Sequence, residues 1–200
     1  MRTGFRVVRL TAGPVGPLSF ALSPGQCLMV RGRSGVGKSL LLRALADLDP
    51  AVGQVFVDGD ERLSMEAPIW RRLVGLVPAE PGWWDERLGA HFDDWPQARA
   101  QFAELLLPDF GPDRRLATLS TGERQRLALV RALTVRPRVL LLDEITSALD
   151  EDSRRAVETR LRVFLDQGGM AVWVSHDGAQ TARMASLVLD LPDGSIRPCP

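Results

Sequence analysis

Apolar and polar positions follow two different periods along this chain, which predicts strands interleaved with helices. Residues 5–10 and 18–22 are short, partly alternating runs on either side of two Gly-Pro pairs, as in antiparallel strands joined by a turn. Residues 53–59 alternate and end in Asp-Gly, which predicts an edge strand and a turn. Further strands are predicted from compact apolar runs at 26–30, 73–77, 139–142, 170–174 and 187–191, the first two of them buried.

Helical spacing of apolar residues fills most of the stretches between these runs. Because strands that alternate with helices form parallel sheets, we expect an α/β fold with a mainly parallel core sheet and an N-terminal antiparallel β sub-domain. From residue 79 to 112 the composition changes to tryptophan, proline and acid, which predicts an inserted helical sub-domain. Helices are predicted over 38–48, 96–107, from Thr118 or Ser120 to about 135, over 152–166 and over 180–185.

The length suits a single domain over residues 1–200. We assign residues 1–78 and 136–200 to the core with its antiparallel part, and residues 79–135 to the helical sub-domain.

Composition narrows the class of protein. Hydrophobic residues make up 45% and charged residues 25% of the chain, as in soluble globular proteins. A formal net charge of zero without a basic block argues against a nucleic-acid partner. No segment resembles a secretory signal and no run reaches the ~20 apolar residues that span a bilayer, so we expect a cytoplasmic location. Cys27 and Cys199 form neither a metal pattern nor a disulfide framework.

A glycine-rich loop follows the strand predicted at 26–30 and opens the helix predicted from residue 38. Its sequence at 32–39, Gly-Arg-Ser-Gly-Val-Gly-Lys-Ser, fits the phosphate-binding pattern G-x-x-x-x-G-K-[ST]. The glycines let successive backbone N–H groups point inward, and the helix adds its positive N-terminal end. Lys38 is the one lysine among 25 basic residues, and its compact ammonium suits a place between phosphates.

These features predict the fold of P-loop NTPases with a bound nucleoside triphosphate. Lys38 is expected to act in catalysis as well as in binding. The residues expected to contact the nucleotide here are Gly32, Arg33, Ser34, Gly35, Val36, Gly37, Lys38, Ser39 and Leu40.

Two adjacent carboxylates end the apolar strand predicted at 139–142. Asp143 is expected to hold Mg²⁺, through water, together with the Ser39 hydroxyl. Glu144 is expected to orient and polarise the attacking water. A single acid at a strand end is common, but two in a chain with a phosphate loop predict a hydrolytic site.

Two further features allow a structural and a functional interpretation. Ser120 and Gly122 open a helix in the manner of an anion site, but Ser120 with Glu123 three residues later is also an ordinary capping box. His176 directly follows a predicted strand, where it would hydrogen-bond a terminal phosphate, although a lone histidine there is more often structural.

Taken in order and spacing, five segments resemble the ATP-binding subunit of ABC transporters. The resemblance covers nearly the whole chain and implies two ATP molecules between two head-to-tail copies. It implies that the phosphate loop of one copy faces the signature segment of the other, that Asp150 lies in the loop crossing the dimer interface and that His176 is the switch histidine. The motif wording is most similar to small iron-export cassettes. The segments are 32–39, the signature 119–123 (Leu-Ser-Thr-Gly-Glu), 139–144, 147–150 and 175–177.

Three positions depart from the pattern of that family. The signature usually has glycine where this chain has Thr121 and glutamine where it has Glu123, so we expect weaker binding on the signature side. A glutamine that touches Mg²⁺ and relays to the permease usually follows the strand at 73–77, but Ala79 stands there and Glu80 follows.

An aromatic residue that stacks on adenine is also missing from its usual place. The corresponding residues 11–13 are Thr-Ala-Gly, and the chain has no tyrosine. Unless Phe5 takes this role, we expect poor discrimination between ATP and GTP.

Trp83 and Trp84 lie in a polar, proline-flanked stretch just after Ala79. Aromatic pairs are more often core than interface, but the resemblance implies that a membrane subunit docks near this segment. We therefore expect both tryptophans to line the permease groove.

The sequence thus favours a cytoplasmic ATPase subunit, bound to the inner face of the membrane through a separate permease, that uses ATP and Mg²⁺ and exports a metal such as iron. The alternatives are a soluble ABC-type ATPase and a regulator that senses ATP without turning it over. Sustained heptads between residues 39 and 119, typical of DNA-repair types, are absent.

Overall fold

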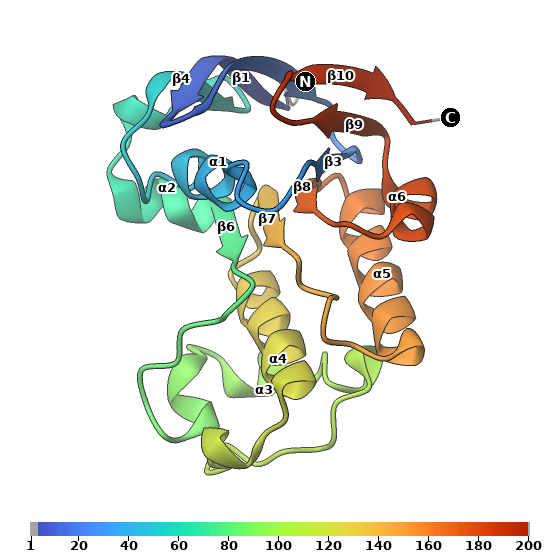
Figure 1. The fold of residues 1–200 in the computed structure, drawn as a ribbon. Helices are drawn as coiled ribbons and strands as arrows, with labels where there is room; N and C mark the ends of the chain where they lie inside the picture. Colours follow the sequence, from blue (N-terminus) through green and yellow to red (C-terminus); the bar gives the residue numbers. More distant parts are fainter. Residues whose placement is uncertain (1–3, 200) are drawn as a thin grey trace.

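The structure is a computed structural model that describes residues 4–199. Two β-sheets lie one above the other, with α1 between them and further helices beneath the larger sheet (Figure 1). In the larger sheet, of order β10-β9-β3-β8-β7-β6, strands β9, β3, β8, β7 and β6 are parallel and β10 runs antiparallel to β9. The smaller sheet is antiparallel, of order β2-β1-β4-β5. The strands are β1 (Phe5–Ala12), β2 (Val15–Leu22), β3 (Cys27–Arg31), β4 (Val52–Val57), β5 (Asp60–Glu61), β6 (Val74–Val77), β7 (Val139–Asp143), β8 (Met170–Val174), β9 (Leu187–Asp190) and β10 (Ser195–Pro198).

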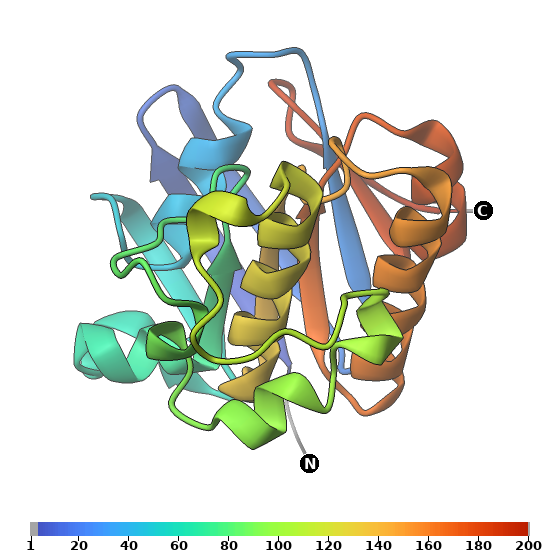
Figure 2. The same cartoon turned by 90° about the horizontal axis from the view of Figure 1, so that it is seen from below.

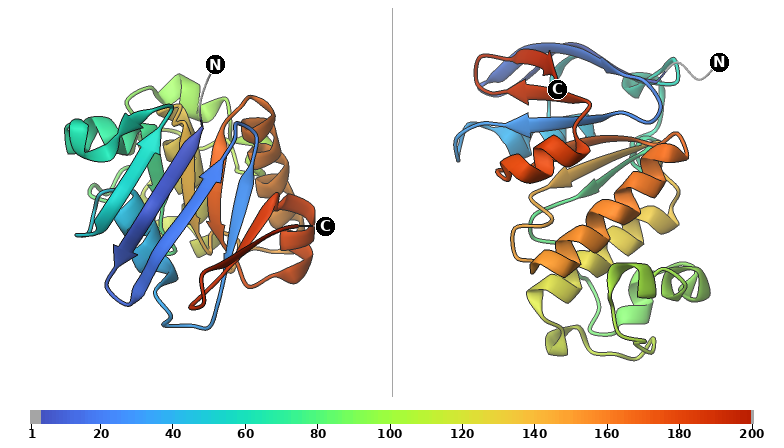
Figure 3. Two further views of the ribbon diagram at one scale, coloured as in Figure 1. Left: turned by 90° about the horizontal axis from the view of Figure 1, so that it is seen from above. Right: turned by 90° about the vertical axis from the view of Figure 1, so that its right-hand side faces the viewer.

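Helices cover the two faces of the parallel sheet differently. Seen from below, α4 and α5 lie on one face, and the segment with the short helices between β6 and α4 crosses over them (Figure 2). Seen from above, the antiparallel sheet covers the opposite side (Figure 3, left). No helix within residues 4–199 is both long and apolar enough to cross a membrane. The helices are α1 (Lys38–Leu45), α2 (Ala67–Leu73), α3 (Trp95–Arg99), α4 (Thr121–Thr134), α5 (Glu151–Asp166) and α6 (Gly178–Met184), with 3₁₀ turns η1 (Arg62–Ser64), η2 (Leu88–His91), η3 (Ala103–Leu105) and η4 (Leu116–Thr118).

The central strands are wholly apolar because each of them serves two cores. Successive side chains of a strand point to opposite faces of the sheet. In β7, Val139 and Leu141 join the core beneath the antiparallel sheet, and Leu140 and Leu142 join the core under α4 and α5. β8 divides in the same way, with Trp173 on the α4 and α5 side.

The predicted fold class is confirmed, and most predicted elements lie within a few residues of those observed. The predicted edge strand at 53–59 is wrong in one respect, since β4 lies between β1 and β5. The strand predicted as buried at 73–77 is the outermost strand of the parallel sheet, β6. α1 ends at Leu45 rather than at residue 48, and Asp47 adopts the left-handed conformation with φ 57°.

The single helix predicted over 96–107 is also wrong. α3 stops at Arg99, η3 spans Ala103–Leu105, and Leu106 has a left-handed backbone with φ 52°. Arg99 pairs with Asp109, and this turn brings the side chains that follow Leu106 back into the core. A straight helix would have carried those side chains away from the core. Helix α2 and strand β10 were not predicted, because α2 fully buries only Trp70 and β10 has no buried residue.

Candidate functional site

The phosphate loop lies between the carboxyl end of β3 and the start of α1. Gly35 and Gly37 adopt left-handed conformations, with φ 77° and 103°. A Cβ atom on Gly37 would lie 2.3 Å from Cγ2 of Val15, so the fold requires glycine there. The Lys38 side chain is held inside the loop, where Nζ donates to the carbonyls of Gly32 at 3.0 Å and Arg33 at 3.1 Å.

The start of α1, next to the phosphate loop, has the features of an anion-binding site. Ser39 is exposed at the first turn of α1, and no side chain caps that helix end. The first N–H groups of the helix therefore have no side-chain cap, and the Lys38 ammonium lies in the loop that leads into the same helix end.

Glu144 and His176 meet at the same edge of the sheet. Asp143, the last residue of β7, is buried, and Glu144 follows it with a left-handed backbone, φ 49°. The Glu144 N–H donates to the carbonyl of Val174 at 3.0 Å, which fixes the end of β7 against β8. Nε2 of His176 lies 3.0 Å from Oε1 of Glu144. Because β8 lies between β3 and β7, this pair sits beside the phosphate loop.

A cavity of about 160 Å³ opens beside this pair and includes Arg154, which sequence reasoning missed. Arg154 Nη1 lies 3.4 Å from Oδ2 of Asp177, and Nη2 donates to the carbonyl of Leu149 at 3.4 Å. Arg154 follows Asp150 by one helical turn, a spacing that could have drawn attention to it. The cavity is lined by Glu144, Thr146, Ser147, Arg154, Ser175, His176 and Asp177.

Asp150 caps the N-terminus of α5. Oδ1 of Asp150 accepts from the Ser153 N–H at 2.8 Å, and Oδ2 accepts from the Ser153 hydroxyl at 3.0 Å. These hydrogen bonds hold the pKa of Asp150 below its ordinary value. The buried Arg126 of α4 donates to the same hydroxyl, so the helix that follows the signature is joined to the loop that contains Asp150.

The signature segment forms a complete capping box. Ser120 Oγ accepts from the Glu123 N–H at 3.2 Å, while Oε2 of Glu123 accepts from the Ser120 N–H at 2.7 Å and from Ser120 Oγ at 2.9 Å. Thr121 is exposed, and Gly122 lies against Leu149. The motif therefore does cap α4, as its structural interpretation predicts, whereas its contact with a phosphate stays a prediction.

One chain does not bring the signature to its own phosphate loop. Figure 3 (right) shows the turn before α1 and the N-terminus of α4 on the same side of the molecule but at opposite ends of it. Within one copy, the phosphate loop thus lies near the carboxyl ends of β7 and β8 and far from the N-terminus of α4.

The structure shows where the residues lie at which this chain differs from the family pattern. Phe5 is fully buried in the core beneath the antiparallel sheet, so it is unable to stack on a base. Ala79 and Glu80 are exposed beside Thr121, around a cavity of about 280 Å³. A glutamine does reach this turn from α4, since Gln125 Nε2 donates to the carbonyl of Pro78 at 3.1 Å.

Trp83 and Trp84 differ in exposure. Trp83 is half-buried against the core under α4 and α5, whereas Trp84 is 69% exposed. His91 packs edge-on against both rings, and the guanidinium of Arg131 lies over both, 4.6 and 5.0 Å from their centroids.

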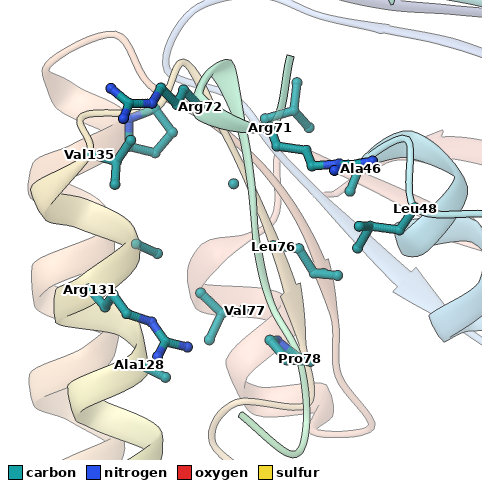
Figure 4. A pocket seen from close by; sticks show the side chains of 14 residues that line it. Ala46, Leu48, Arg71, Arg72, Leu76, Val77, Pro78, Ala128, Arg131 and Val135 are labelled. Atoms are coloured by element: carbon teal, nitrogen blue, oxygen red, sulfur yellow. The ribbon is translucent and has the colours of Figure 1, made fainter. Parts of the chain in front are cut away.

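Arg131 also lines a neighbouring apolar cavity of about 270 Å³. This cavity lies between the end of α1, β6 and one face of α4 (Figure 4).

A family model described as "ABC transporter" matches residues 15–147. The chain belongs to the ABC transporter family. It is 43% identical to the aliphatic sulfonates import ATP-binding protein SsuB of Rhodopseudomonas palustris strain BisA53 over 185 residues, 86% of this chain and 63% of that protein. It is 34% identical to the probable iron export ATP-binding protein FetA of Escherichia coli K12 over 80% of this chain and 76% of that protein. A solved ATP-binding subunit of an ABC transporter superposes with a TM-score of 0.86 at 20% identity, covering 98% of this chain and 90% of that one, which shows the fold.

Members of this ABC family bind ATP with Mg²⁺, and the residues of this chain fit that pair of ligands. The loop offers backbone N–H groups and one ammonium to phosphate, and Ser39 with Asp143 offers two oxygen ligands of the kind that Mg²⁺ prefers. The chain spans 63% of the length of each of two SsuB relatives from Rhodopseudomonas palustris.

Proposed function

We propose that this chain binds and hydrolyses ATP to drive a separate membrane permease, from the cytoplasmic face of the membrane. The observation that supports this most is the contact between Glu144 and His176 beside the phosphate loop. A carboxylate and an imidazole 3.0 Å apart, next to an anion cradle, form a site that polarises water beside a terminal phosphate.

Within that site each residue has a role. The backbone from Gly32 to Leu40 holds the phosphates, and Lys38 neutralises charge between them. Ser39 and Asp143 hold Mg²⁺, which offsets the phosphate charge when bound. Glu144 accepts a proton from the attacking water, and His176 orients Glu144 and hydrogen-bonds the terminal phosphate.

A second copy completes the site. The turn before α1 and the N-terminus of α4 lie on the same side of the molecule but at opposite ends of it (Figure 3, right). Two copies arranged head to tail would therefore place the signature of each, Ser120, Thr121, Gly122 and Glu123, on the partner's nucleotide. Asp150 would then lie in the loop that crosses between the copies.

For the transported substrate and the direction of transport, we propose export of a metal such as iron. It is supported by the motif wording and by the FetA relative, while the SsuB relatives support import of an aliphatic sulfonate instead. The two are separated by reconstituting the chain with its permease in vesicles and measuring ATP-dependent movement of iron and of an alkanesulfonate. Sulfonate uptake without iron movement would contradict the metal assignment.

The exposed Trp84 and its neighbours form the surface proposed for the permease. A large exposed aromatic ring next to an apolar cavity is typical of a protein interface. We expect that replacing both Trp83 and Trp84 by alanine prevents assembly with the permease, measured by co-purification from membranes. The matched control replaces the exposed Leu63, which lies on η1. Full assembly of the double variant would contradict the contact.

The function is tested by Glu144→Gln. We expect ATP turnover to fall by about 10²- to 10⁴-fold, since general base catalysis is lost. ATP binding is expected to persist, so the variant should accumulate as an ATP-bound dimer in size-exclusion chromatography. Glu66→Gln, at an exposed position just before α2, is the control that should leave turnover unchanged. A wild-type chain without ATPase activity, alone and with its permease, would favour the nucleotide-sensing regulator.

A further inference from the structure

A chain of buried polar side chains joins the loop that follows Glu144 to α6 and α5. Thr146, two residues after Glu144, donates from Oγ1 to Oε1 of Gln180 at 3.2 Å. Gln180 Nε2 donates to Oε1 of Glu158 at 3.1 Å. Arg183 then binds both oxygens of Glu158, with Nε and Nη2 at 2.8 and 2.7 Å. Side chains thus connect the loop after β7 and α5, which both lie between β7 and β8, to α6, which follows β8.

The chemistry of these groups fixes the direction of every hydrogen bond. The Glu158 carboxylate only accepts, so Gln180 must turn its amide nitrogen toward it and its carbonyl toward Thr146. The Thr146 hydroxyl must then donate. Gln180 has no exposed surface, and Thr146 and Glu158 are also buried, so no water replaces a lost partner.

Glu158 stays ionised in this setting. Burial raises the pKa of the carboxyl, but the hydrogen bonds from Arg183 and Gln180 outweigh burial and hold the pKa below its ordinary value. The carboxylate that orients Gln180 is therefore present at neutral pH.

Gln180 is also tied to the segment that contains His176. Its backbone N–H donates to Oδ1 of Asp177 at 3.0 Å, and the hydroxyl of Thr181 donates to the carbonyl of Asp177 at 2.9 Å. Asp177 is the residue directly after His176 and caps α6. The side chain of Gln180 thus holds the Glu144 loop, and its backbone holds the His176 loop.

We propose that Gln180, set by Glu158 and Arg183, is a positioning residue that keeps Glu144 and His176 in register for hydrolysis. This inference rests on the proposed function. The three groups do not touch the nucleotide, and they act by keeping the 3.0 Å contact between Nε2 of His176 and Oε1 of Glu144. A small displacement of such a pair lowers turnover without weakening binding at the phosphate loop.

The sharpest test is Gln180→Glu, which preserves shape but removes the donor toward Glu158. Two carboxylates then face each other in a buried site, which costs free energy whether both stay charged or one takes up a proton, and the amide donor toward Glu158 is lost. We expect kcat for ATP to fall about tenfold or more while KM stays within about twofold of wild type. The ring-proton NMR signals of His176, one of two histidines in the chain, should shift.

A second substitution should restore activity. Adding Glu158→Gln to Gln180→Glu supplies one donor and one acceptor again, so kcat should recover at least in part. Gln167→Glu makes the same chemical change at an exposed position at the end of α5 and should leave kcat, KM and the His176 signals unchanged. Wild-type kcat in a folded Gln180→Glu protein would overturn the proposal.

Thr146→Val tests the positioning role of Gln180 if the Gln180→Glu protein does not fold. Valine keeps the shape of threonine but leaves the Gln180 carbonyl unpaired, so kcat should fall several-fold with KM retained, and Thr146→Ser should restore it. Unchanged kcat in folded Thr146→Val would overturn the proposal.

If the wild-type chain does not hydrolyse ATP, the proposed function fails, and the His176 signals in the same variants still test the positioning role. Unchanged signals would then overturn it.

Discussion

Lys38 shows how one residue can be read fully from sequence. The pattern that contains it requires an ammonium inside a glycine loop, and the structure places Nζ there, held by two loop carbonyls. Neither Phe5 nor a glutamine at position 79 is available to share the binding of nucleotide, because Phe5 is buried and position 79 is alanine.

We therefore expect Lys38→Ala to abolish detectable nucleotide binding as well as turnover. Loss of a charge-assisted contact of about 3 kcal/mol lowers affinity about 100-fold. Isothermal titration with ATP and Mg²⁺ measures this directly. Arg43→Ala, on the exposed side of the same helix, is the matched control and should bind normally. Near-normal affinity in Lys38→Ala would show that the base is held by a group not yet identified.

Sequence located Lys38, Asp143, Glu144 and His176 because each follows a short apolar strand at a recognisable offset. It did not locate Arg126, Arg154 or Gln180, each of which makes side-chain contacts with residues 22 to 34 positions away along the chain. A motif records spacing within one segment, whereas these side chains are selected by the packing of α4, α5 and α6. Local pattern was therefore enough to place these side chains at one edge of the sheet, but it did not reveal the side chains that pack behind them, and the chemistry of the site stays a prediction.

At the scale of elements, the same limit explains which predictions failed. β3, β7 and β8 were recognisable because both faces of each strand are buried, so their sequences are continuously apolar. The helix predicted over 96–107 has correct periodicity, but Leu107 and Phe110 are buried in the same core as Ala98, which requires a turn between them. Tertiary packing overrides helical spacing there.

The N-terminus of α4 carries a prediction of its own. The Glu123 carboxylate occupies the N–H and hydroxyl of Ser120, the groups that a partner's nucleotide would contact in the proposed dimer. Glutamine preserves a capping box but removes the negative charge. We expect Glu123→Gln to leave the melting temperature nearly unchanged and to strengthen ATP-dependent dimerisation about fivefold, equivalent to about 1 kcal/mol.

Analytical ultracentrifugation of the Glu144→Gln protein, with and without Glu123→Gln, would measure this. Glu104→Gln, an exposed change on η3, serves as control. Equal or weaker dimerisation on removing the Glu123 charge would place the carboxylate away from the partner's nucleotide.

At the scale of the whole molecule, we expect base recognition to be the weakest part of the proposed nucleotide site. Residues 11–13 end β1 and begin the turn to β2, beside the phosphate loop, and offer no aromatic ring. Stacking on an aromatic side chain is typically worth about 1–3 kcal/mol per base. Without it, affinity comes mainly from the phosphates, which ATP and GTP share.

We therefore expect ATP and GTP to bind with affinities within about threefold of each other. Competition between the two nucleotides for the Mg²⁺-loaded protein measures the ratio. Introducing an aromatic ring with Thr11→Tyr should raise the preference for ATP if the turn lies beside the base. A strong preference for ATP in the wild-type chain would contradict the expectation.

The position of the only lysine has one further effect. Lys38 offers an internal cleavage point to a lysine-specific protease, but it is the first residue of α1, and its side chain is 6% exposed and bonded within the loop. Cleavage there requires local unfolding of this loop. Because the cut would separate residues 1–38 from 39–200, the rate at which the intact chain disappears reports every opening, local or global, that exposes the phosphate loop.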